Sequence, residues 1–360
     1  MENNNAGKMD LLDQAGAVRA GEELPLQAIT QFLNQSGIVV SGIPQLTQFS
    51  GGASNLTYLL TYPEKELILR RPPQGHKAKS AHDMVREARL MQALQPVYGY
   101  VPKVLAICED SSVAGADFYV MDRLRGIIPR KNLPKQLTLS LSETRTLCTN
   151  VIDKLIELHQ IDYQAAGLQG LGLGAGYVQR QIKGWSERAV LAKTDNSADF
   201  SDVVSWLEKN QPQQDAATCL IHNDFRMDNV VLNVDNPLEV IGVLDWEMAT
   251  LGDPLMDLGN TLAYWAQSDD DAFFLSLRRQ PTHLPGMLTR AEVMSYYTEK
   301  MGFSASHTDF YVIFGLFRLA IIIQQIYYRY HHGQTTNPQF AGFVAMTNYF
   351  HERCLNLIKE

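Results

Sequence analysis

The sequence contains few cysteines, and they lie far apart. No two of them form a Cys-x-x-Cys pair or another metal-ligand spacing, and the four stand at Cys108, Cys148, Cys219 and Cys354. A disulfide framework and a zinc module both require cysteines at close, repeated spacings. We therefore expect four core thiols in the reducing interior of a cell.

An excess of basic residues is also missing. The 31 Lys and Arg residues are outnumbered by 39 Asp and Glu residues, which leaves a formal net charge of -8. A general nucleic-acid binder neutralises phosphates with clustered Lys and Arg. This balance excludes nucleic acid as a partner, and any anionic ligand must be held by local cations.

Long apolar runs are absent as well. The longest, residues 310–323, is interrupted by Gly315 and Arg318, whereas a membrane span needs about 20 apolar residues. It predicts a buried helix and no membrane partner. The first 23 residues are polar, lack the basic and apolar regions of a signal peptide, and predict a loosely held leader on a cytoplasmic protein.

The pattern of apolar residues predicts an α+β chain. Short apolar and β-branched runs between turn residues indicate an early antiparallel sheet, with strands at 43–49, 56–62, 66–70, 104–108 and 118–121. Helical spacing begins near Leu26, returns at 80–94 and dominates after residue 141. Because a chain of 360 residues suits two domains, we predict a leader over 1–27, a small lobe over 28–125 and a larger helical lobe over 126–360.

An island of strand and turn residues within the helical half carries the strongest chemical signal. His222, Asp224 and Asn229 follow the pattern His-x-Asp-x4-Asn, and Asp245 ends an apolar strand sixteen residues later. Phosphoryl transfer needs one carboxylate to accept a hydroxyl proton, together with an amide oxygen and a second carboxylate to hold Mg²⁺. The protein-kinase catalytic loop has the same Asp-to-Asn interval. Ordinary surface turns explain three such residues at this spacing less well.

A glycine-rich turn between the first two expected strands gives a second signal. Gly51 and Gly52 allow close approach of backbone N–H groups to phosphates, and Ser54 and Asn55 add side-chain donors. The spacing fits neither GxGxxG nor the Walker pattern, so a plain β-turn is the alternative. Its position ahead of the other motifs favours a phosphate-binding role.

A basic residue on the third expected strand gives a third signal. Kinases use a strand cation to hold the α and β phosphates, and a helix Glu holds that cation in place. Here Arg70 stands where Lys is usual, and Glu87 on the next helix is the candidate partner. Arg keeps the charge as a planar fork. Salt-bridged surface residues are the alternative interpretation.

Together these motifs resemble the signature of the aminoglycoside phosphotransferase and choline kinase superfamily. The usual order is His-Gly-Asp, a later Asn, Ile-Asp-Trp-Glu and Gly-Asp-Pro-x-x-Asp. This chain has the segments His222-Asn223-Asp224, Leu244-Asp245-Trp246-Glu247 and Gly252-Asp253-Pro254-Leu255-Met256-Asp257. This chain departs from the usual order at Asn223, where Gly is common. The local turn is affected if it needs a positive φ, because a residue other than Gly adopts positive φ at a higher energetic cost.

The resemblance implies a protein-kinase-like bilobal fold that uses ATP and Mg²⁺. It implies that Asp224 is the catalytic base, that Asn229 and Asp245 are Mg²⁺ ligands, and that His222 and Asp257 organise the loop. The hinge beside the adenine would include Met121, Asp122 and Leu124.

In finer detail, the sequence resembles the kinase-like proteins found with acyl-CoA dehydrogenases. This resemblance extends from about residue 28 to the end of the chain. The stretches that carry this resemblance are Leu-Arg-Arg-Pro-Pro, Asp-Phe-Arg-x-Asp-Asn and Phe-Arg-Leu-Ala-Ile. This branch implies that the acceptor is a small molecule, a hydroxyacyl-CoA such as a 4-hydroxyacyl-CoA, and a functional link to an acyl-CoA dehydrogenase. Arg226, Trp185 and Arg318 are the candidate acceptor residues. An aminoglycoside, choline or sugar kinase and a silent nucleotide-binding scaffold are the alternatives.

Overall fold

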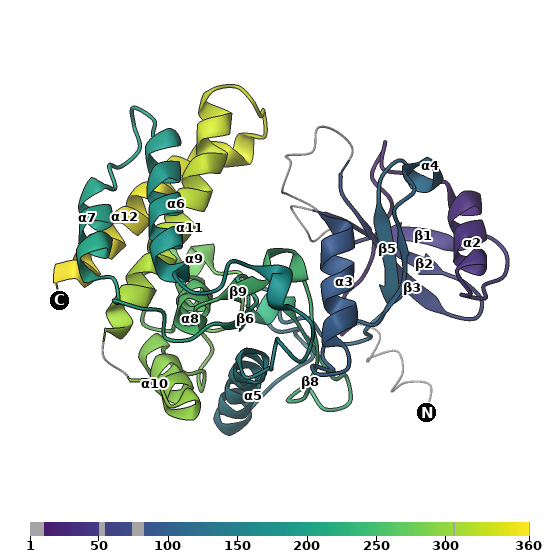
Figure 1. Cartoon of the computed structure of the whole chain (residues 1–360), viewed down its shortest axis with the longest axis horizontal. Helices are drawn as coiled ribbons and strands as arrows, with labels where there is room; N and C mark the ends of the chain where they lie inside the picture. The colour runs from purple at the N-terminus through teal and green to yellow at the C-terminus, as the bar shows by residue number, and fades with distance from the viewer. Residues whose placement is uncertain (1–10, 50–54, 74–82, 305–306, 360) are drawn as a thin grey trace. The chain divides into compact units, whose positions relative to one another are not determined.

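The computed structural model describes residues 11–49, 55–73, 83–304 and 307–359, which divide into two compact units (Figure 1). The first unit contains Met1–Leu139, Ala165–Leu168 and Met227–Met248. The second contains Ser140–Gln164, Gln169–Arg226 and Ala249–Glu360. The boundary between Arg226 and Met227 therefore runs through the island of motif residues.

The first unit is built on an antiparallel sheet. Its strand order is β1-β2-β3-β5-β4, and the strands are β1 (Gln45–Gln48), β2 (Leu56–Thr61), β3 (Glu66–Arg71), β4 (Val104–Cys108) and β5 (Phe118–Asp122). The predicted α+β class is confirmed, and each predicted strand forms with ends shifted by two residues or fewer. In this register Arg70 on β3 lies opposite Tyr119 on β5.

Two helices cover the faces of this sheet (Figure 1). Helix α2 (Leu26–Gln35) buries Ile29 and Leu33, four residues apart, against apolar side chains of the strands. Helix α3 (Met84–Leu94) begins at Asp83, whose carboxylate accepts a hydrogen bond from the backbone N–H of Arg86. A shorter helix, α4 (Ser111–Ala114), precedes β5.

The segment before α2 is attached to the sheet, so the prediction of a loose leader is wrong for the described part of it. Gly16 and Gln48 exchange backbone hydrogen bonds of 2.8 and 2.9 Å along the edge of β1. The hydroxyl of Tyr58 donates to the backbone oxygen of Glu22 at 2.8 Å. Leu24 is buried in the core of the unit. These are long-range contacts, which the local polar composition does not reveal.

A hairpin from the second half of the chain also belongs to the first unit. Strands β7 (Val230–Leu232) and β8 (Val240–Val243) pair antiparallel, which confirms the predicted hairpin. Backbone hydrogen bonds of 2.8 Å join Leu232 to Ile127 in both directions. Gly126 permits this approach, because a Cβ there would lie 2.3 Å from the oxygen of Leu232.

The second unit is mainly helical. It contains the small sheet of β6 (Cys219–Ile221) and β9 (Thr250–Gly252). Its helices are α5 (Leu141–His159), α6 (Tyr177–Leu191), α7 (Ser201–Asn210), α8 (Pro254–Ala263), α9 (Ala272–Leu277), α10 (Arg290–Met301), α11 (Thr308–His331) and α12 (Phe343–Lys359).

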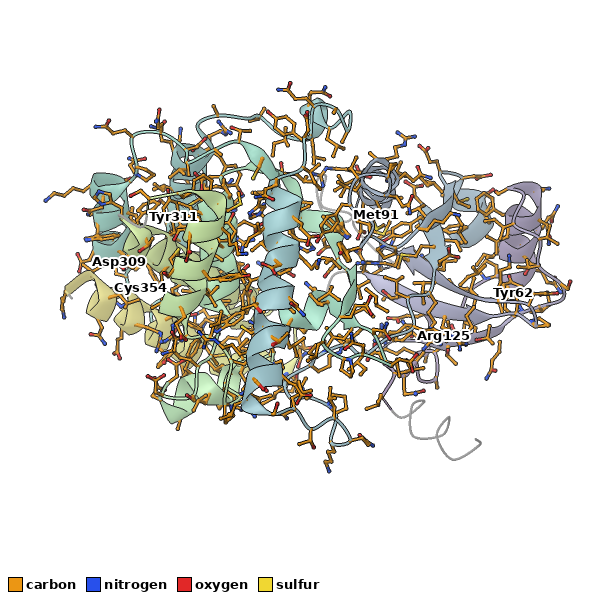
Figure 2. All side chains as sticks on the ribbon, turned by 90° about the horizontal axis from the view of Figure 1, so that it is seen from below. Tyr62, Met91, Arg125, Asp309, Tyr311 and Cys354 are labelled. Atoms are coloured by element: carbon orange, nitrogen blue, oxygen red, sulfur yellow. The ribbon has the colours of Figure 1, made fainter. Side chains whose placement is uncertain are left out.

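Helix α11 is the core of this unit. Its length and apolar composition would suffice to cross a membrane, but 78% of its most apolar window is buried within the protein. Gly315 on α11 lies against α8, where a Cβ would come within 2.1 Å of the backbone oxygen of Gly259. The predicted buried helix is therefore confirmed. The four cysteines are buried as well and form no disulfide; Cys354 is labelled in Figure 2.

Candidate active site

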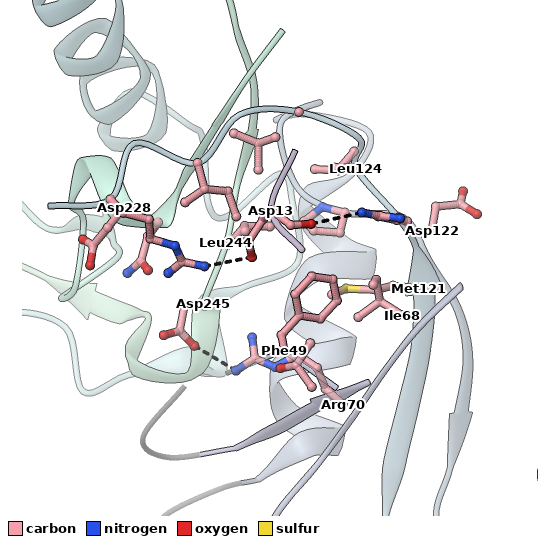
Figure 3. A pocket seen from close by; sticks show the side chains of 18 residues that line it. Asp13, Phe49, Ile68, Arg70, Met121, Asp122, Leu124, Asp228, Leu244 and Asp245 are labelled. Atoms are coloured by element: carbon pink, nitrogen blue, oxygen red, sulfur yellow. Dashed lines mark hydrogen bonds and ion pairs between the residues drawn. The ribbon is translucent and has the colours of Figure 1, made fainter. Parts of the chain in front are cut away.

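Arg70 stands at the centre of the site residues of the first unit. Its Nη1 donates to Oε1 of Glu87 at 3.1 Å, and its Nη2 donates to Oδ1 of Asp245 at 2.9 Å (Figure 3). The planar guanidinium therefore donates hydrogen bonds to two carboxylates at once, one on α3 and one just after β8. A single ammonium group has no such fork. The predicted pair of Arg70 and Glu87 forms in the structure.

Burial and charge determine the protonation of this group of side chains. Burial raises the pKa of Glu87 to about 7, and the neighbouring Arg70 opposes that rise. Burial would lower the pKa of Arg70, but Glu87, Tyr119 and Asp245 together raise it well above its ordinary value. Oε1 of Glu87 also accepts from the backbone N–H of Trp246 at 3.2 Å. Glu87 thus ties α3 to both β3 and the turn after β8.

A pocket in the first unit brings the predicted nucleotide residues together (Figure 3). One part of its wall is apolar and includes Phe49, Ile68, Met121, Leu124, Val231 and Leu244. The polar part of the wall includes Arg70, Asp122, Asp228, Asn229 and Asp245. Six residues that were predicted separately, at 70, 121, 122, 124, 229 and 245, therefore line one pocket.

The β7–β8 hairpin positions the two predicted metal ligands. Asn229 precedes β7, Asp245 follows β8, and the N–H of Leu244 donates to the backbone oxygen of Asn229 at 2.7 Å. Asp245 has the left-handed backbone angle φ of 70°. The backbone hydrogen bond between Leu244 and Asn229 therefore keeps the amide of Asn229 and the carboxylate of Asp245 at the same end of the hairpin.

The pocket lining fits ATP and Mg²⁺ chemically. Amide and carboxylate oxygens are Mg²⁺ ligands, and Mg²⁺ commonly completes its shell with water and phosphate oxygens. Arg70 supplies a cation for phosphates, and the apolar wall suits a purine ring. Gly51, Gly52 and Ser54 lie outside the described residues. Asn55 is described, and its Nδ2 donates to Oε2 of Glu247 at 2.6 Å.

A charged group at the pocket includes two residues, Asp13 and Arg130, that the sequence prediction did not assign to it. The carboxylate of Asp13 pairs with Arg130 at 2.9 Å, and the backbone oxygen of Asp13 accepts from Arg123 at 3.2 Å (Figure 3). All three line the pocket. Asp13 lies within the predicted leader, and its polar surroundings in the sequence contain no pattern that indicates this position.

The second unit holds the His222-Asn223-Asp224 segment directly after β6. The carboxylate of Asp257 on α8 accepts from the backbone N–H of His222 at 2.7 Å and from that of Asn223 at 2.8 Å. His222 is fully buried, and its Nδ1 accepts from the backbone N–H of Asp224 at 3.3 Å. Backbone donors and a buried ring therefore fix the path of this loop.

Asp257 is a buried anion with several donors. Burial alone would raise its pKa, but hydrogen bonding and charge from His159, together with His222, hold the pKa below its ordinary value. Nε2 of His159 lies 3.0 Å from Oδ2 of Asp257. Asp253 stands directly before α8, four residues before Asp257, and caps the helix by accepting from the N–H groups of Leu255 and Met256.

Two arginines lie beside the loop. Nη1 of Arg226 pairs with Oδ1 of Asp224 at 2.7 Å, and its guanidinium stands 4.8 Å from the ring centroid of Tyr264. Arg318 is buried, donates to the backbone oxygen of Asn223 at 3.2 Å, and stands 5.4 Å from the ring centroid of Trp185. Arg226 thus touches the predicted base, Arg318 contacts the loop backbone, and Trp185 lies against Arg318.

Known proteins resemble this chain along most of its length. Acyl-CoA dehydrogenase family member 10 of Mus musculus is 34% identical over 323 residues, or 89% of this chain and 30% of that protein. Acyl-CoA dehydrogenase family member 11 of Homo sapiens is 31% identical over 336 residues, or 92% of this chain and 42% of that protein. The chain therefore spans less than half the length of these curated relatives.

A solved structure resembles the whole fold. The crystal structure of a candidate aminoglycoside phosphotransferase from Ralstonia eutropha JMP134 matches with a TM-score of 0.80 and 28% identity, over 94% of this chain and 99% of that one. The model of the phosphotransferase enzyme family matches residues 45–292, which include the strand Arg70, the His-x-Asp loop and the Asp-Trp-Glu motif. The resemblance predicted from these motifs is confirmed, and the chain belongs to the phosphotransferase enzyme family.

Proposed function

We propose that the protein is an ATP-dependent phosphotransferase that acts on the hydroxyl group of a small molecule, with a hydroxyacyl-CoA as acceptor. The observation that carries the proposal is the fork of Arg70 between Glu87 and Asp245 in a pocket that Asn229 also lines. Phosphoryl transfer depends mainly on positioning and charge neutralisation. This pocket offers a cation for phosphates and oxygen ligands for Mg²⁺.

In this proposal each residue has one role. Arg70 orients the α and β phosphates, while Asn229 and Asp245 hold Mg²⁺, which supplies charge neutralisation on the triphosphate when bound. Asp224 orients the acceptor hydroxyl and takes its proton as the oxygen bonds to the γ-phosphorus. The bond between that phosphorus and the bridging oxygen of ADP breaks in the same step. His222 and Asp257 hold the backbone on which Asp224 stands.

Two observations support an acyl-CoA as the acceptor: the cation beside the candidate base and the names of the curated relatives. A polycationic aminoglycoside needs an acidic acceptor site, whereas the candidate base has the cation of Arg226 at 2.7 Å. A cation in this position favours an acceptor with anionic groups, such as an acyl-CoA. The curated relatives are named acyl-CoA dehydrogenases, which supports a functional link to such an enzyme. Phosphate leaves more readily than hydroxide, so phosphorylation prepares a hydroxyacyl chain for elimination.

An acceptor panel tests the proposal. Wild-type protein and the Asp224→Ala variant are incubated with Mg·ATP and a 4-hydroxyacyl-CoA, kanamycin, choline or a hexose, and products are weighed by mass spectrometry. We expect the gain of one phosphate on the acyl-CoA with wild type, and a loss of at least about 100-fold in the variant. Retention of Mg·ATP binding by the variant is the control.

The other outcomes identify the alternatives. Phosphorylation of kanamycin alone would identify an aminoglycoside kinase, the function named for the Ralstonia structure. Nucleotide binding without transfer to any acceptor would identify a silent scaffold. Undiminished transfer by Asp224→Ala would remove Asp224 as the base.

A further inference from the structure

Asn223, the residue before the candidate base, has an unusual backbone. Its φ is 65°, in the left-handed region, and its side chain is buried. Asn tolerates this region better than most residues other than Gly, but it still meets a steric cost. The usual form of the related motif has Gly at this position. A buried Asn in this conformation therefore calls for compensating contacts.

Side chains on three helices hold Asn223 by hydrogen bonds. Its N–H donates to Asp257 at 2.8 Å, and its backbone oxygen accepts from Arg318 at 3.2 Å. Its side-chain Oδ1 accepts from the hydroxyl of Tyr177 at 3.1 Å and from Nδ2 of Asn260 at 3.2 Å. A glycine could keep the two backbone contacts, but it has no group that replaces Oδ1.

We infer that Asn223 is a positioning residue, which uses its amide oxygen to fix the orientation of the Asp224 backbone. This inference rests on the proposed function, in which Asp224 accepts the proton. Arg318 holds the backbone oxygen of Asn223, and Nδ1 of His222 holds the N–H of Asp224. Tyr177 and Asn260 add an anchor for the Asn223 side chain to α6 and α8, and this anchor keeps the residue before Asp224 in place. A shift of about 1 Å in a reacting group can cost about 100-fold in rate.

Kinetics of single and double variants test this role. Asn223→Gly relieves the backbone strain and removes only the amide contacts. We expect kcat to fall by about 10-fold or more while KM for ATP changes by less than about 2-fold. Tyr177→Phe should lower kcat by about 3-fold, because it removes one of the two donors. In the Asn223→Gly background the same Tyr177→Phe change should have no further effect, since its acceptor is gone.

Tyr296→Phe is the matched control. It removes a hydroxyl that donates to Asp153 at 2.6 Å in the same unit, outside the loop. We expect an unchanged kcat for this variant. The inference is overturned if Asn223→Gly keeps kcat within about 2-fold of wild type, or if Tyr177→Phe acts equally with and without Asn223.

Hydrogen exchange gives a readout that needs no acceptor. The peptide over residues 222–226 should exchange at least about 10-fold faster in Asn223→Gly than in wild type, while peptides of α10 stay unchanged. Unchanged exchange at 222–226 would overturn the inference by itself. Faster exchange in a protein that phosphorylates no acceptor would refute the proposed function and leave the positioning contact standing.

Discussion

Arg70 shows how one side chain determines the character of a site. The guanidinium is buried and has one carboxylate on each arm. Its position on β3 and the presence of Glu87 on the next helix could be predicted from the order of motifs. The contact with Asp245, 175 residues further along the chain, could not be predicted, since nothing local in the sequence connects the two residues.

Substitution of Arg70 tests the fork. Lys at this position keeps the charge but has one donor group, so Arg70→Lys should reduce kcat/KM for ATP by about 10-fold, and Arg70→Met by at least about 100-fold. Steady-state kinetics at saturating acceptor measures both values. Arg70→Met should also destabilise the fold by about 3–5 kcal/mol, because it leaves Glu87 buried without its cation. Full activity of Arg70→Met would contradict the assigned role.

Asp257→Asn tests the buried anion beneath the loop. We expect the free energy of unfolding at pH 7 to fall by about 2–4 kcal/mol, since an amide cannot accept as strongly from His159 and the two loop N–H groups. The pKa of Asp257 is lower in the folded protein than its ordinary value. Its stabilising effect is therefore fully present above about pH 4 and is lost as the pH falls through the folded pKa.

Urea titration of both proteins at several pH values checks this expectation. The stability gap between wild type and Asp257→Asn should narrow as the solution is acidified below about pH 4. A gap that is the same at pH 7 and pH 3 would show that the charge of Asp257 does not stabilise the loop.

Elements with a strong periodic pattern could be predicted well, and the others could not. The hairpin of β7 and β8 and the buried helix α11 follow from local apolar runs and turn residues. The attached segment at Gly16 does not, because a single backbone pairing with Gln48 leaves no periodic trace in the side chains. Positive backbone angles are also hard to predict from the sequence. The motif comparison indicated a positive φ at Asn223, but nothing in the sequence indicated the positive φ of Asp245.

Helix α8 offers a test at the scale of an element. Asp253 caps this helix, and burial raises the pKa of its carboxyl to about 6 although three backbone N–H groups donate to it. Between about pH 4 and pH 6 the folded state then holds a proton that the unfolded chain has released. The contribution of this group to stability therefore decreases as the pH rises through that window.

Asp253→Asn removes this titration. The stability of the variant relative to wild type should rise by up to about 3 kcal/mol between pH 4 and pH 7, as a shift of about two pKa units implies. The measurement is a pair of urea titrations at the two pH values. A relative stability that is independent of pH would mean that Asp253 titrates normally in the folded protein.

For the whole molecule, the family and fold class could be predicted from the order of the motifs. The assignment of residues 227–248 to the first unit could not. Residues 227–248 belong to the first unit because the hairpin bonds to Ile127 and because the N–H of Val243 donates to the backbone oxygen of Tyr100 at 2.8 Å. These contacts join segments more than 100 residues apart. Sequence order alone placed the hairpin with the helices that flank it.

The identity of the acceptor is also a property of the whole molecule, because the candidate acceptor residues lie far apart in the sequence. The motifs identify the phosphotransferase enzyme family, but no local pattern in the sequence identifies the residues that select the acceptor. Arg226 could be proposed because it stands two residues from Asp224 in the sequence. Arg318 and Trp185 were proposed by residue type, as a cation and an aromatic for an acyl-CoA. In the structure both are buried, Arg318 donates to the backbone oxygen of Asn223, and Trp185 lies against Arg318.

In the proposed function, Arg70, Asn229 and Asp245 hold Mg·ATP for transfer of its γ-phosphoryl group to a hydroxyl. The most direct measurement is single-turnover transfer of labelled γ-phosphate to a 4-hydroxyacyl-CoA by wild type and by Asp245→Asn. We predict labelled acyl-CoA from wild type with Mg²⁺, none after chelation, and a rate at least about 100-fold lower for the variant. Equal transfer by wild type and Asp245→Asn would show that Asp245 does not hold Mg·ATP for the transfer.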